Sequence, residues 1–178
     1  MIFLYIGGGI VALIIILALI SPKSATLNRS VSVNVTPEEA FQALRSLKTF
    51  DEWSPWADRD PNQERGYRGT DGEVGSQAWW KGNKQVGEGE QEIMKLEPNS
   101  LVEMQLRFFK PFKATNKAWF KIEPEGSGSK VTWGFYADFK PPTSIFMMFM
   151  NFEKTLGADY EKGLNSFKSR METATANA

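Results

Sequence analysis

Between residues 66 and 139, six strand-like runs follow one another with only short turns between them, and this succession constrains the fold more than any other feature. The turns carry glycine, asparagine and proline signals, as at Gly82-Asn83 and Pro98-Asn99. Connections this short cannot cross over a sheet, so neighbouring runs must pair in antiparallel fashion. The expected strands lie at residues 66–69, 74–81, 85–96, 101–109, 114–122 and 130–139, and an alternating run at 27–35 supplies a seventh.

Residue parity within these runs separates an apolar face from a polar face. The polar face carries charged side chains such as Glu103, Arg107 and Lys121. The apolar face carries Val102, Met104, Leu106, Phe108, Ala118, Phe120, Ile122, Val131, Trp133, Phe135 and Ala137. A sheet that is apolar on one face must be covered there by another element.

The expected cover is one long helix that runs from about residue 143 into the region of Arg170. This segment follows Pro141-Pro142 and contains no further proline. Apolar side chains recur in it at steps of three and four, as one helical stripe does: Phe149, Phe152, Leu156, Tyr160, Leu164, Phe167 and Met171. Sheet and helix together predict an α+β fold, in which a long C-terminal helix covers the apolar face of an antiparallel sheet of about seven strands.

A short helix is expected directly after the first strand. Thr36, Pro37 and Glu39 combine an N-cap hydroxyl, proline at the first helical position and glutamate at the third. The aromatic segment 49–56 follows as a short helix or turn. In the long C-terminal helix, Gly157 and Gly163 each lower the stability of the helix by about 1 kcal/mol relative to alanine. Their presence indicates that the helix approaches the sheet closely or bends at these positions.

Residues 2–20 form an uncharged apolar run that, as a helix at about 1.5 Å per residue, spans about 28 Å, close to the hydrocarbon thickness of a bilayer. We therefore expect a transmembrane anchor at residues 1–22, a tether at 23–26 and a single domain at 27–178. A cleaved signal peptide is the alternative, but no Lys or Arg precedes the run and no A-x-A-like site closes it. Lys23 and Arg29 follow the run, which favours a single-pass membrane protein with its large domain in the cytoplasm.

Composition excludes several kinds of chemistry. The 178 residues contain no Cys and no His, which rules out Ser/His/Asp and Cys/His nucleophile systems and zinc sites built on these residues. Lys plus Arg (21) equals Asp plus Glu (21), and a chain of zero net charge has no global field to attract nucleic acid. We expect no cofactor, no metal and no nucleic-acid partner, and a domain that is monomeric.

Several short motifs occur in a definite order from about Leu27 onward: WSPW at 53–56, Trp80-Lys81-Gly82-Asn83, Val86-Gly87-x-Gly89, Val131-Thr132-Trp133 and Gly163-Leu164. Together they resemble the polyketide cyclase/dehydrase-like branch of the START/Bet v 1 (SRPBCC) superfamily. The resemblance implies the helix-grip fold, with an apolar cavity between the curved sheet and the long helix. Members bind lipids, sterols, polyketides or other hydrophobic molecules, and some are enzymes. The apolar run before the domain resembles the N-terminal anchor that many bacterial members carry.

The wall of such a cavity follows from strand parity and from the helical stripe. The candidate ligand-binding residues of the sheet are Trp80, Met104, Leu106, Phe108, Phe120, Trp133 and Phe135. Those of the helix are Phe149, Phe152, Leu156 and Tyr160. The alternative is that these side chains fill a solid core. No residue is assigned a catalytic role.

Two groups of carboxylates have both a structural and a functional interpretation. Glu88, Glu90 and Glu92 share one face of a strand, and facing inward they could serve as general acid and base. A solvated, outward face is favoured. Four loop carboxylates lack the spacing of a calcium loop, and we interpret them as turn residues: Asp58, Asp60, Asp71 and Glu73.

The sequence thus predicts a membrane-anchored binding protein for a hydrophobic small molecule, a lipid or an isoprenoid-like compound. The membrane is reached through residues 2–20 and through an apolar lip at 145–150, next to the hairpin at 108–112. The alternative is an enzyme of the cyclase, dehydratase or hydrolase type, free of cofactors, that acts on a hydrophobic substrate with carboxylate or Tyr acid/base groups. A second alternative is a protein interaction module whose core is filled.

Overall fold

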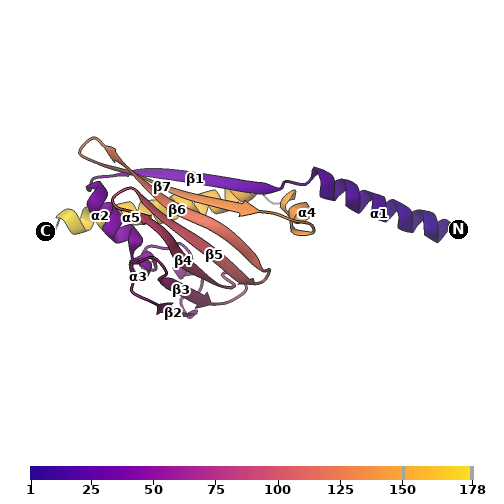
Figure 1. Ribbon diagram of the computed structural model, residues 1–178, viewed down its shortest axis with the longest axis horizontal. Coiled ribbons are helices and arrows are strands. Elements are labelled where there is room, and N and C mark those ends of the chain that lie inside the picture. Colours follow the sequence, from indigo (N-terminus) through magenta and orange to yellow (C-terminus); the bar gives the residue numbers. More distant parts are fainter. Residues whose placement is uncertain (150, 177–178) are drawn as a thin grey trace.

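The strands form one continuous antiparallel sheet in the order β1-β7-β6-β5-β4-β3-β2 (Figure 1). The computed structural model describes residues 1–149 and 151–176, without the side chains of Ile2, Leu4, Phe152, Thr175 and Ala176. The strands are β1 (Ser24–Val33), β2 (Glu64–Arg68), β3 (Gln77–Lys81), β4 (Glu88–Glu97), β5 (Leu101–Lys110), β6 (Ala114–Glu125) and β7 (Gly128–Asp138). The chain therefore runs as a meander from β2 to β7, as the short turns predict, and β1 pairs with β7.

Helices α2, α3 and α5 lie on one face of this sheet, whereas α1 extends away from it (Figure 1). They are α1 (Ile2–Ile20), α2 (Pro37–Arg45), α3 (Leu47–Phe50), α4 (Thr143–Met147) and α5 (Phe152–Ala176), with a 3-10 turn η1 (Ala57–Arg59). α5 packs along the sheet beside β1, and α2 packs against β5, β6 and β7. A curved sheet around a C-terminal helix is the predicted helix-grip arrangement.

α2 begins where the sequence predicts. The Thr36 hydroxyl accepts a hydrogen bond from the Glu39 amide at 3.3 Å, and the Glu39 carboxylate accepts one from the Thr36 amide at 2.8 Å. These bonds form a capping box. Hydrogen bonds from the Thr36 backbone and side chain hold the pKa of Glu39 below its ordinary value of 4.5.

The packed core lies under α2 and α3. At its centre is Trp53, whose ring centroid lies 4.8 Å from that of Phe50, 5.5 Å from that of Trp133 and 5.2 Å from that of Phe167. Phe120 joins this aromatic cluster at 5.8 Å from Trp53. One end of the space between sheet and helices is therefore filled by side chains.

The predicted strands 74–81 and 85–96 begin three residues before β3 and β4, and the predicted tether also differs from the structure. Residues 24–26 of the predicted tether belong to β1, because their backbone pairs with 136–138 of β7. The small and polar side chains of Ser24, Ala25 and Thr26 have no apolar alternation that would reveal a strand.

The predicted single C-terminal helix is divided into α4 and α5. Asn151 begins α5, since its side-chain oxygen accepts a hydrogen bond from the Lys154 amide at 2.9 Å. A cap at this position starts a new helix in the middle of the predicted one. Met150 and the side chain of Phe152 lie outside the described part of the chain.

α1 projects away from the sheet (Figure 1). At its C-terminal end the Ser21 hydroxyl donates a hydrogen bond to the Ser144 hydroxyl of α4 at 2.8 Å, and both side chains are buried. Among the described residues, no helix reaches the length and hydropathy that a membrane crossing requires. The transmembrane part of the predicted fold is therefore not supported.

Candidate functional site

A cavity of about 830 Å³ opens beside the packed core, between the apolar face of the sheet and the helices α4 and α5. On the sheet side, the lining side chains form rows, because paired residues of neighbouring strands lie next to one another. One row is Ala78, Gln91, Leu106 and Asn116, and the next towards the core contains Met104, Ala118 and Phe135. Leu156 and Tyr160 of α5 and Met147 of α4 close the cavity from the opposite side.

The structure places eight of the eleven predicted wall residues at this cavity: Trp80, Met104, Leu106, Phe108, Trp133, Phe135, Leu156 and Tyr160. Phe120 does not line it, because α3 and Trp53 cover that end of the sheet and bury Phe120 in the aromatic cluster. Phe149 does not line it either. It is 78% exposed, because the chain turns away from the helical stripe between α4 and α5. The side chain of Phe152 is outside the described residues.

The wall between cavity and core consists of two stacked rings. Trp133 of β7 and Tyr160 of α5 lie 3.9 Å apart at their centroids, with 17° between their planes. Gly163 permits this approach of α5, since a Cβ at that position would lie 2.8 Å from the Trp133 ring and 3.1 Å from Pro55. Burial raises the pKa of the Tyr160 hydroxyl, so at neutral pH it is a proton donor in hydrogen bonds.

Four of the uncharged polar side chains in the lining are buried. They are Ser54, Gln91, Asn116 and Tyr160, exposed by only 7%, 6%, 9% and 3%. Within the described part of the chain, these side chains make no hydrogen bond to the protein, and their polar atoms are open to the cavity, whereas Trp53 Nε1 is unpaired and fully enclosed. Sequence reasoning missed Asn116, although it shares the inward parity of Ala118, and Ser54, whose turn carries no parity signal.

The charged groups of the lining lie at its rim. Lys84, Lys113 and Lys140 are exposed and form no ion pair with any described residue. Asp51 is partly buried, accepts a hydrogen bond from the Tyr67 hydroxyl and pairs with Arg65 at 3.5 Å. In the described chain, no carboxylate of the lining is fully buried.

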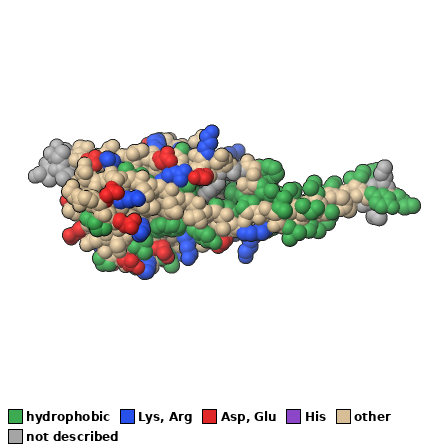
Figure 2. All heavy atoms as spheres, turned by 90° about the horizontal axis from the view of Figure 1, so that it is seen from above, with side chains coloured by type: hydrophobic (Ala, Val, Ile, Leu, Met, Phe, Trp, Pro, Cys, Tyr) green, Lys and Arg blue, Asp and Glu red, His purple; other side chains and the backbone are tan. Residues whose placement is uncertain are grey.

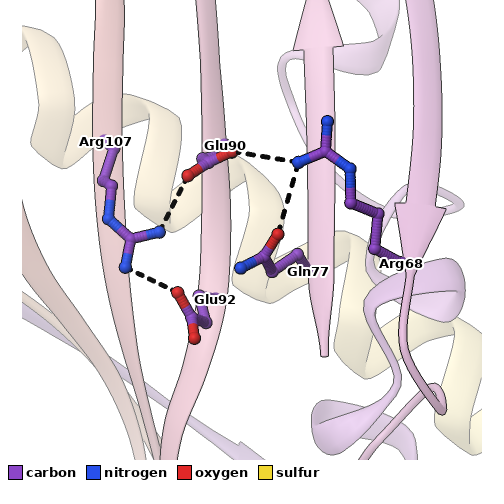
Figure 3. Close-up of polar contacts among 5 residues, drawn as sticks. All are labelled: Arg68, Gln77, Glu90, Glu92 and Arg107. Carbon is purple, nitrogen blue, oxygen red and sulfur yellow. Dashed lines mark hydrogen bonds and ion pairs between the residues drawn. The ribbon is translucent and has the colours of Figure 1, made fainter. Parts of the chain in front are cut away.

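The acidic run of β4 faces away from the cavity, as the favoured interpretation predicts (Figure 3). Arg107 donates hydrogen bonds to Glu90 at 2.8 Å and to Glu92 at 2.5 Å. Arg68 pairs with Glu90 from the other side at 3.5 Å, and Lys110 pairs with Glu88 at 2.7 Å on the rim of the sheet. These carboxylates hold neighbouring strands together on the outer face.

The loop carboxylates serve turns and ion pairs. Asp58 pairs with Lys162 at 2.9 Å, and Asp60 accepts a hydrogen bond from the Asn83 amide at 2.7 Å. Asp71 accepts one from the Leu47 amide at 2.8 Å, at the start of α3. Over residues 1–149 and 151–176, no cluster of three or more Asp or Glu side chains could hold a metal ion.

The sequence matches, over residues 24–172, the family described as "Polyketide cyclase / dehydrase and lipid transport". The chain belongs to this family. The match begins at the first residue of β1 and ends within α5, so this polyketide cyclase/dehydrase family domain comprises the whole sheet and both walls of the cavity. A comparison with curated proteins finds no match.

Solved structures share the fold of this family member. The Aha1 dimer from Colwellia psychrerythraea has a TM-score of 0.58 at 19% identity, over 83% of this chain and 96% of that one. Ara h 8.0201 has a TM-score of 0.57 at 12% identity, over 84% and 99%. The di-domain ARO/CYC StfQ of the steffimycin biosynthetic pathway has a TM-score of 0.64 at 13% identity, over 86% of this chain and 52% of that one. At 12–19% identity, these likenesses show that the fold is shared.

Proposed function

We propose that this protein binds a hydrophobic small molecule, a lipid or an isoprenoid-like compound, in the cavity between sheet and α5. The observation that carries the proposal is the cavity itself. Its volume of about 830 Å³ lies within the usual range of roughly 300–1,000 Å³ for small-molecule sites, and aromatic and aliphatic side chains make most of its wall. The family description, which includes lipid transport, supports the same function.

Only one end of the space between sheet and helices is filled by side chains, and this distinguishes a binding protein from a module with a filled core. The aromatic cluster around Trp53 fills one end, whereas Leu106, Phe108 and Trp80 face open space at the other. Met104 and Met147 border that space, and flexible thioether side chains adapt to ligands of different shape.

Analysis of bound lipid tests the proposal. The full chain is purified in amphipol, extracted with organic solvent and examined by mass spectrometry, with an unrelated membrane protein prepared in the same way as control. We expect one class of hydrophobic molecule to be enriched. Returning it to the delipidated protein should change the fluorescence of Trp80 and Trp133, which line the cavity. No enriched molecule and no fluorescence response to any lipid would contradict the proposal.

An enzyme of the cyclase or dehydratase type is the second candidate, supported by the family description and by two groups of the lining. Tyr160 could donate a hydrogen bond to a substrate carbonyl, and Asp51 could accept a proton. Asp51 is, however, already engaged by Tyr67 and Arg65. Under this candidate, Asp51→Asn and Tyr160→Phe would leave ligand binding intact and abolish turnover; persistence of turnover in both variants would exclude these roles.

We further propose that α1 and the lip contact a lipid surface. Apolar side chains gather along α1 and where it joins the body (Figure 2). Phe112 of the β5–β6 hairpin and Phe146 of α4 are exposed near the cavity rim, where Lys113 and Lys140 could meet anionic headgroups. Placement of the domain in the cytoplasm remains a prediction, as does a monomeric state.

Vesicle flotation tests the membrane proposal. The full chain should float with vesicles that contain anionic lipid, and removal of residues 1–20 should weaken flotation more than Phe112→Ser with Phe146→Ser. A chain without residues 1–20 that floats as strongly as the full chain would contradict the role of α1.

A further inference from the structure

Gln91 and Asn116 flank Leu106 in one row across the sheet. Gln91 of β4 pairs with Leu106 of β5, and Leu106 pairs with Asn116 of β6. Neighbouring strands lie about 4.8 Å apart, so the two residues stand roughly 10 Å from each other at the backbone. Both side chains line the cavity. A ligand segment that rests on Leu106 therefore passes between two amides.

Neither amide has a protein partner. Both side chains are more than nine-tenths buried, and in the described chain neither makes a hydrogen bond. An amide offers two donors and one acceptor, and burying it unpaired is unfavourable compared with an apolar side chain of similar shape. Ser54 and Tyr160 line the same cavity, and their hydroxyl groups are likewise buried without a hydrogen-bond partner in the described chain. Partners for these groups must come from the cavity.

All four groups are uncharged. The lysines of the lining are exposed at its rim, and the partly buried Asp51 is paired with Arg65. A carboxylate that entered as far as Leu106 would lose its hydration shell without meeting a buried cation. A hydroxyl or carbonyl group would instead find both donors and acceptors.

We infer that the ligand is an uncharged oxygenated amphiphile, whose hydroxyl or carbonyl group hydrogen-bonds to Gln91 and Asn116 over Leu106. The inference rests on the proposed function of the cavity and narrows its ligand class. A pure hydrocarbon satisfies neither amide, and a fatty acid carries a charge that the inner cavity does not neutralise.

The test compares three probes of equal chain length on the full chain in amphipol: hexadecane, hexadecanol and hexadecanoate, each displacing a pyrene-labelled alkane. The variants are Gln91→Leu, Asn116→Leu and the double variant. Gln105→Leu is the matched control, because Gln105 lies on the opposite face of β5 from Leu106 and is not a lining residue of the cavity, so this exchange removes an amide outside the site.

We expect hexadecanol to bind most tightly to the unmodified chain. Each leucine substitution should weaken hexadecanol binding by about tenfold and leave hexadecane binding unchanged or tighter. Gln105→Leu should keep the preference for the alcohol and the affinity of the unmodified chain. The ligand-free variants should melt at the same or a higher temperature, because an unpaired buried amide has been removed.

Three results would overturn the inference, and they can be told apart. If hexadecane binds as tightly as hexadecanol, or if the double variant keeps the preference, water satisfies the amides and the proposed function stands without this specificity. If hexadecanoate binds most tightly, the ligand class is anionic. If no probe displaces the labelled alkane, the proposed function fails together with the inference.

Discussion

Gly157 and Gly163 both lie inside α5, but an added methyl group would meet different surroundings at the two positions. At Gly163 it would press on the rigid, buried Trp133 ring at 2.8 Å. At Gly157 it would meet the Arg29 guanidinium at 2.6 Å, which is the far end of a long side chain that pairs with Glu161 on the surface. Gly163→Ala should therefore lower the free energy of unfolding by about 1–3 kcal/mol. Gly157→Ala should be close to neutral, because the gain in helix propensity of about 1 kcal/mol compensates for moving Arg29. Denaturant unfolding measures both, and equal effects would contradict this account.

Residue parity predicts which face of a strand is apolar but not which inward side chains meet open space. Phe120 and Phe135 have the same parity on neighbouring strands, yet only Phe135 lines the cavity. The difference arises from Trp53 and Phe50, which approach Phe120 from a distant segment of the chain. No local pattern around Phe120 contains that information.

Among the elements, α2 offers a test of its cap. Thr36→Ala should lower the free energy of unfolding by about 1 kcal/mol at neutral pH. The pKa of Glu39 is lowered in the folded protein, so its contribution to stability is present above the ordinary value of 4.5 and is lost as the pH falls through the folded pKa. The loss of unfolding free energy caused by Glu39→Gln should therefore become smaller at acidic pH. Thermal unfolding of both variants across this pH range tests the direction of this change. A loss of stability in Glu39→Gln that becomes larger at acidic pH would contradict it.

The strands and α2 could be predicted because their signals are local: alternation, turn residues and a capping box. The division of the C-terminal helix could not be predicted from its apolar stripe, which continues across Asn151. The signal was present in Asn151 followed by Glu153, a cap residue and an acidic first turn, but the spacing of the apolar residues pointed to one helix.

For the whole molecule, the structure predicts that α1 is dispensable for folding. The sheet, the aromatic cluster and both cavity walls lie after Pro22, and the family match begins at residue 24. Removal of residues 1–20 should leave a cooperatively unfolding domain, because α1 contacts the domain mainly through α4, and the Ser21–Ser144 hydrogen bond stays in the shortened chain. Circular dichroism checks the unfolding, and light scattering checks the expected monomer. Aggregation or loss of cooperative unfolding would show that α1 belongs to the fold.

The last prediction separates a binding cavity from an ordinary core by two enlargements on one strand. Leu106 and Val102 lie on the same face of β5, but Leu106 borders the cavity whereas Val102 is fully buried outside it. Leu106→Trp should extend into open space, changing the free energy of unfolding little while it weakens binding of the labelled alkane at least tenfold. Val102→Phe should instead destabilise the protein by about 1–3 kcal/mol, because no space receives the larger ring. Melting temperature and probe binding are measured for both variants. Equal destabilisation would mean that the space over Leu106 is closed in solution, and a stable Leu106→Trp variant that still binds the probe would place the ligand elsewhere.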